Sequence, residues 1–140
     1  MGAKNLASLA ESFDLFDSWE DRYRYLIDLG QRLPSMDESL KTDENKVKGC
    51  TSQVWLHAEP SVNETGEKIF HFVADSDAQI VKGLIYILVL AYQDQSYSSI
   101  EELDIHDAFE RLGLSGHLSP SRRNGFFAMV EHIRALTTSS

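Results

Sequence analysis

One cysteine, Cys50, has the greatest capacity for chemistry in this sequence. It follows Lys48 and Gly49 and precedes Thr51, in a segment that is polar and locally basic. Neighbouring ammonium groups favour the thiolate, the form that attacks sulfur and carbon electrophiles. A free cysteine is also often a small buried hydrophobe. The pattern by itself therefore leaves a reactive and a structural cysteine equally open.

The sequence contains no second cysteine. An internal disulfide cannot form, so a reactive Cys50 must pass whatever it receives to another molecule. One thiol also cannot supply the several thiolates that ordinarily hold an iron–sulfur cluster. A lone thiol fits a reducing compartment, and we expect a cytoplasmic protein.

Two arginines at the start of a predicted helix form a second candidate group. Arg122 and Arg123 follow Ser119 and Pro120, a hydroxyl cap with proline at the first helical position. Free amide donors in this turn would suit an anion or a partner's carboxylate. Solvated arginines without a role would show the same spacing, so the position alone favours the simpler interpretation.

Histidines and carboxylates offer two further alternatives. His57 and His71 could face each other across a predicted hairpin, but the chain has no His-x-x-x-His motif and no cysteine pair, so we predict no metal site. A hydrolase triad of Cys50, a histidine and Asp75 is conceivable, although no sequence motif supports it.

Apolar periodicity predicts helices on both sides of a small sheet. Apolar ranges predict helices at 6–16, 19–33, 80–91 and 107–112, the second after a Ser18 cap and the third after a Ser76 cap. Ser99 opens a further short helix, and Ser119 opens a last helix whose inner face includes Leu136. Two alternating runs, 53–59 and 68–75, predict an antiparallel hairpin around a turn at 60–67. Residues 35–49 form a long polar loop that ends at the cysteine, and such loops are often functional.

Composition and charge narrow the class of protein. A chain of 140 residues fits one domain, 1–140. Thirteen basic against 22 acidic residues give a net charge of −9, which disfavours nucleic acid and anionic membranes as partners. No apolar run approaches the ~20 residues of a membrane span, and the first residues lack the pattern of a secretory signal.

Six short blocks lie in a fixed order between about residue 6 and residue 136. They are Trp19-Glu20-Asp21-Arg22-Tyr23, Leu29-Gly30-Gln31-Arg32-Leu33-Pro34, Gly49-Cys50 followed by Ser52-Gln53-Val54-Trp55, Asp75-Ser76-Asp77-Ala78, Ile80-Val81-Lys82-Gly83-Leu84 and Leu118-Ser119-Pro120-Ser121-Arg122. These blocks resemble the SufE family of sulfur-acceptor proteins, and lean toward its SufE branch rather than the CsdE paralogue. The resemblance implies an α+β fold with a small antiparallel sheet packed against helices, as in the cluster scaffold IscU.

The resemblance also implies a function for Cys50. It would accept persulfide sulfur from a cysteine desulfurase of the SufS or CsdA type, stimulate that enzyme, and pass the sulfur to a scaffold such as the SufBCD complex for iron–sulfur cluster assembly. Pyridoxal phosphate belongs to the desulfurase, and no cofactor is implied for this chain. The chain would be an accessory sulfurtransferase rather than an autonomous enzyme. An IscU-like cluster scaffold and a cysteine hydrolase remain alternatives.

Finally, the resemblance implies where the acceptor lies and what surrounds it. Cys50 would lie at the tip of a loop beside the sheet, rest in an apolar pocket and swing out to meet the desulfurase. The implied loop and docking residues are Lys48, Gly49, Thr51, Ser52, Gln53, Asp75 and Arg122. Arg123-Asn124 departs from the Ser-Gln more usual in the family, and Thr51 replaces a larger polar residue, so the docking contacts stay open.

Overall fold

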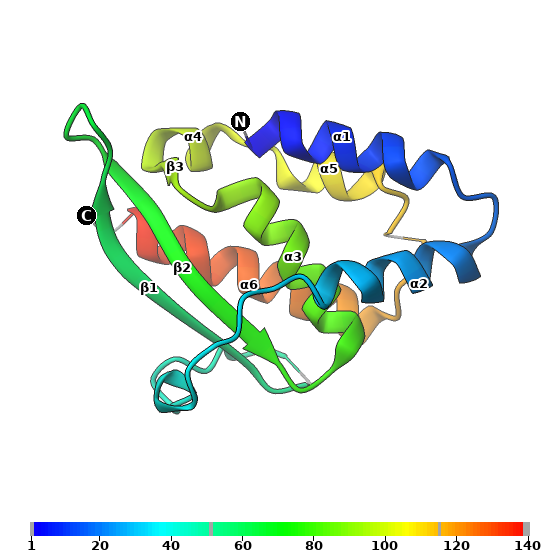
Figure 1. Cartoon of the computed structure of the whole chain (residues 1–140), viewed down its shortest axis with the longest axis horizontal. Coiled ribbons are helices and arrows are strands. Elements are labelled where there is room, and N and C mark those ends of the chain that lie inside the picture. The colour runs from blue at the N-terminus through cyan, green and yellow to red at the C-terminus, as the bar shows by residue number, and fades with distance from the viewer. Residues whose placement is uncertain (1, 51, 115, 139–140) are drawn as a thin grey trace.

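The computed structural model describes residues 2–50, 52–114 and 116–138. Within these ranges helices and a small sheet alternate along the chain (Figure 1). The elements are α1 Gly2–Asp14, α2 Trp19–Gly30, the 3-10 helix η1 Glu38–Leu40, β1 Val54–Val62, β2 Lys68–Ser76, α3 Gln79–Tyr92, β3 Gln95–Ser96, α4 Tyr97–Glu102, α5 Ile105–Arg111 and α6 Pro120–Thr138. The expected α+β fold is confirmed.

The sheet is antiparallel, with strand order β1-β2-β3. Leu56 lies opposite Ala74 and Ala58 lies opposite Phe72, so the predicted alternation places one row of apolar side chains on the inner face. Both long strands extend past their predicted ends, β1 through Val62 and β2 through Ser76. The short strand β3 was not predicted, because two residues carry no alternation.

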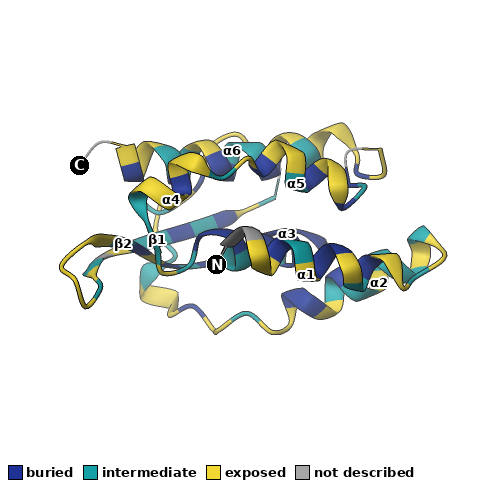
Figure 2. Cartoon of the chain, turned by 90° about the horizontal axis from the view of Figure 1, so that it is seen from above, coloured by how far each residue is buried: buried dark blue, intermediate teal, exposed yellow. Residues whose placement is uncertain are grey.

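The apolar helix α3 lies at the centre of the fold, as its nearly continuous hydrophobic surface predicts. In Figure 2 α1, α2 and α3 lie in one layer and α4, α5 and α6 in another, with their buried residues turned toward each other. Two glycines let α2 and α3 approach closely: a Cβ on Gly30 would lie 2.7 Å from the Gly83 nitrogen, and one on Gly83 would overlap Leu26. No described helix is both long and apolar enough to cross a membrane.

Two predicted helix starts are confirmed by their hydrogen bonds. The Ser18 hydroxyl accepts from the Asp21 N–H at 3.2 Å, and the Ser119 hydroxyl accepts from the Arg122 N–H at 3.3 Å. Each bond satisfies an amide that has no partner within its own helix. The last helix therefore begins at Pro120, in the position that directs its first turn toward the cysteine loop.

Other helix boundaries differ from the prediction. Ala78, not Ser76, is the cap of α3, because the Ser76 hydroxyl lies two residues further back and donates to another carbonyl. The cap of α4 is Ser96 rather than Ser99. The Ser96 hydroxyl accepts a hydrogen bond from the Ser99 N–H. A further cap, Asp104, starts α5 before the predicted range. α2 ends before its predicted limit, and Leu136, predicted on the inner face of α6, is 38% exposed.

The loop that precedes the cysteine is tied to the sheet. Asn45 accepts at its carbonyl from the Leu56 N–H at 2.8 Å, and the Val47 N–H donates to the Val54 carbonyl at 2.8 Å. Met36 and Val47 are buried. The prediction that residues 35–49 form a structureless loop is therefore wrong. The C-terminal part of this segment pairs in antiparallel fashion with the edge of β1.

Candidate functional site

Cys50 lies at the tip of a short turn that brings the chain back into β1. The bond between Val47 and Val54 closes this turn, and Cys50 within it lies against α6. There the half-buried thiol donates to the Gly125 carbonyl at 3.6 Å. The thiol is thus held against α6 in this structure, at the end of a short turn.

A small, mainly apolar cavity adjoins the sulfur. Its volume of about 10 Å³ is close to the minimum that holds one water molecule. The lining residues come from the cysteine loop, β1, α3 and α6: Cys50, Ser52, Val54, Val81, Leu84, Ser121, Arg122, Gly125, Phe126 and Met129. The space beside the thiol is therefore sized for about one added heavy atom.

Burial sets the protonation of the thiol. It raises the pKa of Cys50, so the resting form is the neutral thiol. The side chains of Lys46 and Lys48 are exposed and do not offset this desolvation. The prediction that neighbouring lysines favour a thiolate is therefore wrong for the withdrawn position. A thiolate forms more readily when the sulfur reaches water.

The chain after the cysteine is fixed to the start of α3. Gln53 donates its N–H to the Asp77 carboxylate at 3.1 Å, and its carbonyl accepts from the Ser76 hydroxyl at 2.7 Å and from the Asp77 N–H at 3.3 Å. The Ser76 hydroxyl also accepts from the Ala78 N–H at 3.2 Å. Gln53 therefore acts through its backbone as a support of the cysteine loop.

Asp75 forms a second support, on the other side of the sheet from the core. Its carboxylate lies 3.1 Å from the Lys41 ammonium and 3.6 Å from that of Lys82. Burial opposes its ionisation, but the Ser76 N–H and the two lysines together hold the pKa of Asp75 below its ordinary value. Lys41 belongs to the loop before the cysteine, so this ion pair ties the loop to β2.

The predicted site residues thus divide into three groups. Ser52 and Arg122 line the cavity with Cys50, whereas Gln53 and Asp75 support the loop without lining it. Two others, Lys48 and Gly49, are exposed in the turn itself, and Thr51 lies outside the described residues.

Gly49 has a left-handed backbone, with φ +92°, that only glycine adopts without strain. A Cβ at this position would lie 3.3 Å from the Ala128 side chain of α6. The turn therefore depends on glycine just before the reactive residue.

Sequence analysis did not identify three residues that contact Cys50 or the segments that hold it. Lys41 lies in a polar run with no periodicity, and Ser76 was interpreted as a helix cap. Gly125 stands inside the predicted helix α6, where a glycine is itself a signal because it lowers helix stability.

The structure does not assemble the alternative sites. His57 lies opposite Val73, and His71 lies opposite Glu59, so the two histidines do not face each other. Among the described residues, no group of three or more histidine, cysteine or acidic side chains could hold a metal ion. The triad fails as well, because the Cys50 thiol bonds to a helix carbonyl and Asp75 to two lysines.

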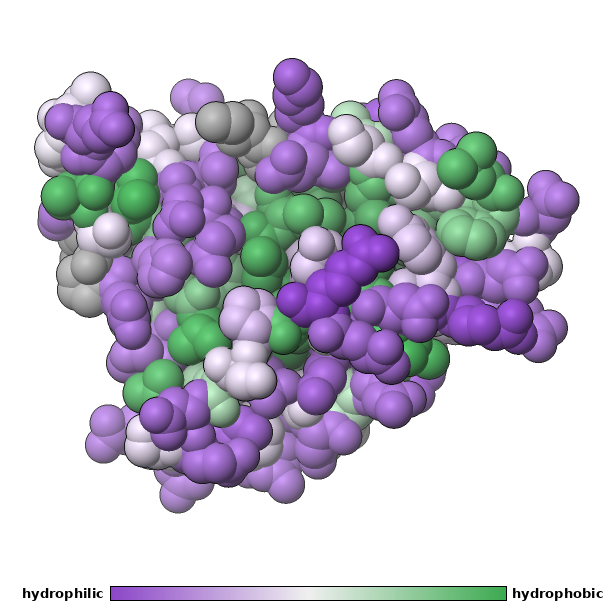
Figure 3. Space-filling view, viewed as in Figure 1, coloured by the Kyte–Doolittle hydropathy of each residue, from purple (hydrophilic) through white to green (hydrophobic). Residues whose placement is uncertain are grey.

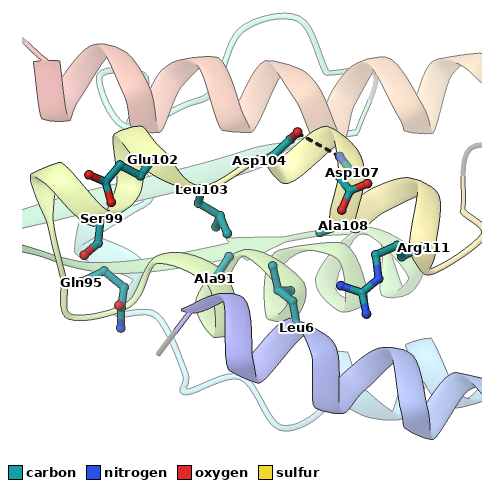
Figure 4. Close-up of a pocket in the computed structure, with 10 residues that line it drawn as sticks. All are labelled: Leu6, Ala91, Gln95, Ser99, Glu102, Leu103, Asp104, Asp107, Ala108 and Arg111. Atoms are coloured by element: carbon teal, nitrogen blue, oxygen red, sulfur yellow. Dashed lines mark hydrogen bonds between the residues drawn. The ribbon is translucent and has the colours of Figure 1, made fainter.

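Four other hollows among the described residues do not include Cys50 in their lining. A cavity of about 420 Å³ between α1 and the α4–α5 segment is lined by residues that include Leu6, Leu103 and Arg111, and its Asp104 carboxylate is engaged as a helix cap (Figure 4). Hydrophilic residues form most of the outline of the face in Figure 3, and hydrophobic ones show near its centre and at parts of its edge. Among the described residues, the cavity lined by Cys50 is the one that adjoins a thiol.

Comparison with known proteins identifies relatives over nearly the whole chain. The family model described as SufE, Fe-S metabolism associated domain, matches residues 7–137. An uncharacterized SufE-like protein of Rhizobium etli is 44% identical over 130 residues, covering 93% of this chain and 87% of the relative. Another, of Rhizobium meliloti, is 41% identical over 133 residues, covering 94% and 93%.

A solved structure shares the fold. The solution structure of a hypothetical protein from Thermus thermophilus superposes with a TM-score of 0.73 at 19% identity, covering 96% of this chain and 94% of the other. At this identity the likeness concerns the architecture of helices and sheet.

Proposed function

Because the chain belongs to the SufE family, whose domain is associated with Fe–S metabolism, we propose that Cys50 accepts persulfide sulfur from a cysteine desulfurase. The sulfur then passes to a cluster scaffold for iron–sulfur assembly. The observation that carries this proposal is the lone thiol at the tip of a closed turn, beside a cavity with room for about one more atom.

The transfer exchanges one S–S bond for another. The Cys50 thiolate attacks the outer sulfur of the desulfurase persulfide, and a new S–S bond forms on Cys50. The donor S–S bond breaks, and its electron pair leaves with the desulfurase cysteine as a thiolate. No oxidant or reductant is consumed, so position and shielding decide how far the exchange proceeds.

The withdrawn position of Cys50 supports a protective role. A persulfide in open solvent is lost to reductants and oxidants. Burial of a group of this size stabilises the withdrawn loop by about 1–2 kcal/mol. Docking of a partner against the loop supplies a comparable free energy, so contact with the desulfurase is sufficient to shift the loop outward.

The surroundings of the cavity support a division of roles. Arg122, in the first turn of α6, is exposed and contributes to the lining of the cavity. During transfer its guanidinium favours the thiolate and the persulfide anion. Gln53 and Asp75 hold the two ends of the loop, while Lys48, Gly49 and Ser52 move with it.

The partners follow from this chemistry. The donor is a desulfurase of the SufS or CsdA type, which carries the pyridoxal phosphate, and the receiver is a scaffold such as the SufBCD complex. We propose a cytoplasmic location for the chain, because its lone cysteine must stay reduced between transfers. The chain accordingly stimulates an enzyme rather than turning over a substrate alone.

The proposal is tested by mixing the protein with a desulfurase and cysteine and measuring intact mass. We expect one added sulfur on the wild-type protein and faster cysteine turnover by the desulfurase. Cys50→Ser is expected to fold normally, to take up no sulfur and to give no stimulation. Uptake by the serine variant equal to that of the wild type would contradict the assignment of Cys50.

A further inference from the structure

An interior glycine of α6 faces the sulfur of Cys50. The Gly125 carbonyl accepts from the thiol at 3.6 Å, and a Cβ built on Gly125 would lie 3.7 Å from the same sulfur. Glycine within a helix is less stable than alanine. The sequence thus has a residue of low helix propensity inside α6, at the position that contacts the Cys50 sulfur.

The resting thiol does not require this glycine. A separation of 3.7 Å is ordinary van der Waals contact, and the Cβ and Cα of Cys50 would lie at 3.9 and 4.0 Å from the added methyl group. Alanine at this position therefore fits the protein in its thiol form. The need for glycine arises when the cysteine carries something larger than a hydrogen atom.

We propose that Gly125 is a positioning residue whose missing side chain leaves room for the outer sulfur of a Cys50 persulfide; this rests on the proposed function. The outer sulfur replaces the thiol hydrogen, which points at the Gly125 carbonyl 3.6 Å away. An S–S bond is about 2.05 Å long, so a sulfur atom on that line would collide with the carbonyl oxygen. It must turn aside, and the adjoining space is the 10 Å³ cavity together with the volume that a Cβ at Gly125 would fill.

The test loads the sulfur without a desulfurase. Wild type, Gly125→Ala and the control Asn124→Ala are treated with sodium tetrasulfide. The Cys50 thiolate attacks a terminal sulfur, which stays on Cys50 while trisulfide leaves with the electron pair. Asn124 is exposed on the same helix, so its change to alanine also raises helix propensity without approaching the cysteine. Intact mass then follows the loss of the added sulfur after dithiothreitol is supplied.

We expect the persulfide of Gly125→Ala to be lost about five- to thirty-fold faster than in wild type and Asn124→Ala, as the loss of 1–2 kcal/mol of shielding predicts. Alkylation of the unloaded thiol by iodoacetamide should be unchanged in all three proteins. A compensating change, Met129→Ala in the Gly125→Ala background, enlarges the same cavity and should restore the longer lifetime.

Several results would overturn the proposal. These are equal persulfide lifetimes in Gly125→Ala and wild type, a wild-type protein that neither takes up nor retains the sulfur, and a Gly125→Ala protein that fails to fold. The last result would show that alanine does not fit beside the resting thiol. If a desulfurase fails to load wild type while tetrasulfide loads it and Gly125→Ala loses it faster, the donor assignment is wrong and the role of Gly125 stands.

Discussion

Replacement of Gly49 by alanine is expected to expose Cys50 more often. Gly49 has φ +92° in the withdrawn loop, and a Cβ there would lie 3.3 Å from the Ala128 side chain. An L-residue in the left-handed region costs about 1–2 kcal/mol. Any open conformation in which residue 49 adopts a negative φ relieves this strain. The substitution therefore destabilises the withdrawn loop relative to the open one.

The expected magnitude follows from that strain. A shift of 1–2 kcal/mol changes the equilibrium between withdrawn and open loops by about five- to thirty-fold. When the loop opens and closes faster than the thiol reacts, the alkylation rate follows the open population. Gly49→Ala should therefore react with iodoacetamide about five- to thirty-fold faster than wild type at one fixed pH.

Gly66 provides a matched control for backbone strain. It also has a positive φ, +82°, but it lies in the turn between β1 and β2, and an added Cβ would meet nothing within 4 Å. Gly66→Ala should lower the free energy of unfolding by a similar amount and leave the alkylation of Cys50 unchanged. Equal alkylation rates for Gly49→Ala and wild type, or equal increases in both variants, would refute the dependence of the withdrawn loop on Gly49.

Four further predictions concern the Asp75 ion pair, the thiol, the packing of α2 against α3, and Arg122. Asp75→Asn should lower the free energy of unfolding at neutral pH by about 1 kcal/mol. The folded-state pKa of Asp75 lies below its unfolded value of about 3.9, so its contribution to the free energy of unfolding is present above that pH and disappears in stronger acid. Urea unfolding at several pH values measures this dependence. Because burial raises the pKa of Cys50, its alkylation rate should continue to rise above pH ~8.5, where an ordinary thiol titrates. A plateau below that pH would contradict the withdrawn position of the thiol. Gly83→Ala should cost about 3 kcal/mol by forcing α2 and α3 apart, whereas Gly116→Ala, with nothing within 4 Å of its added Cβ, should cost far less in the same urea titration. Arg122→Ala should slow sulfur uptake from a desulfurase more than it lowers stability, and an unchanged uptake rate would remove it from the site.

Local sequence patterns predicted most helices and strands, because short-range features of the chain determine where these elements form. The hairpin was predicted from alternation, which directly determines the face on which Leu56, Phe70 and Phe72 lie. The start of α6 was predicted because Ser119 and Pro120 satisfy requirements of the helix end itself. At the starts of α3 and α4 the sequence did not give the cap correctly. The Ser76 hydroxyl instead donates to the distant Gln53 carbonyl, and Ser96 rather than Ser99 caps α4.

The candidate site was less predictable because its chemistry depends on burial. The sequence around Cys50 is basic, which predicts a low thiol pKa, yet the packing of α6 withdraws the sulfur from water and reverses the direction. Likewise, the bond of Asn45 to Leu56 and the pair of Lys41 with Asp75 join segments that no local pattern connects. These long-range contacts hold the loop and determine how the thiol is presented.

The most direct measurement follows labelled sulfur from cysteine through a desulfurase to a single peptide. The protein would be recovered after one turnover with sulfur-labelled cysteine, blocked, digested and analysed by mass spectrometry. The proposed relay predicts that the label lies in the peptide containing Cys50, bound as a persulfide that dithiothreitol releases. Label that stays on the desulfurase, or appears only as free sulfide in solution, would contradict it.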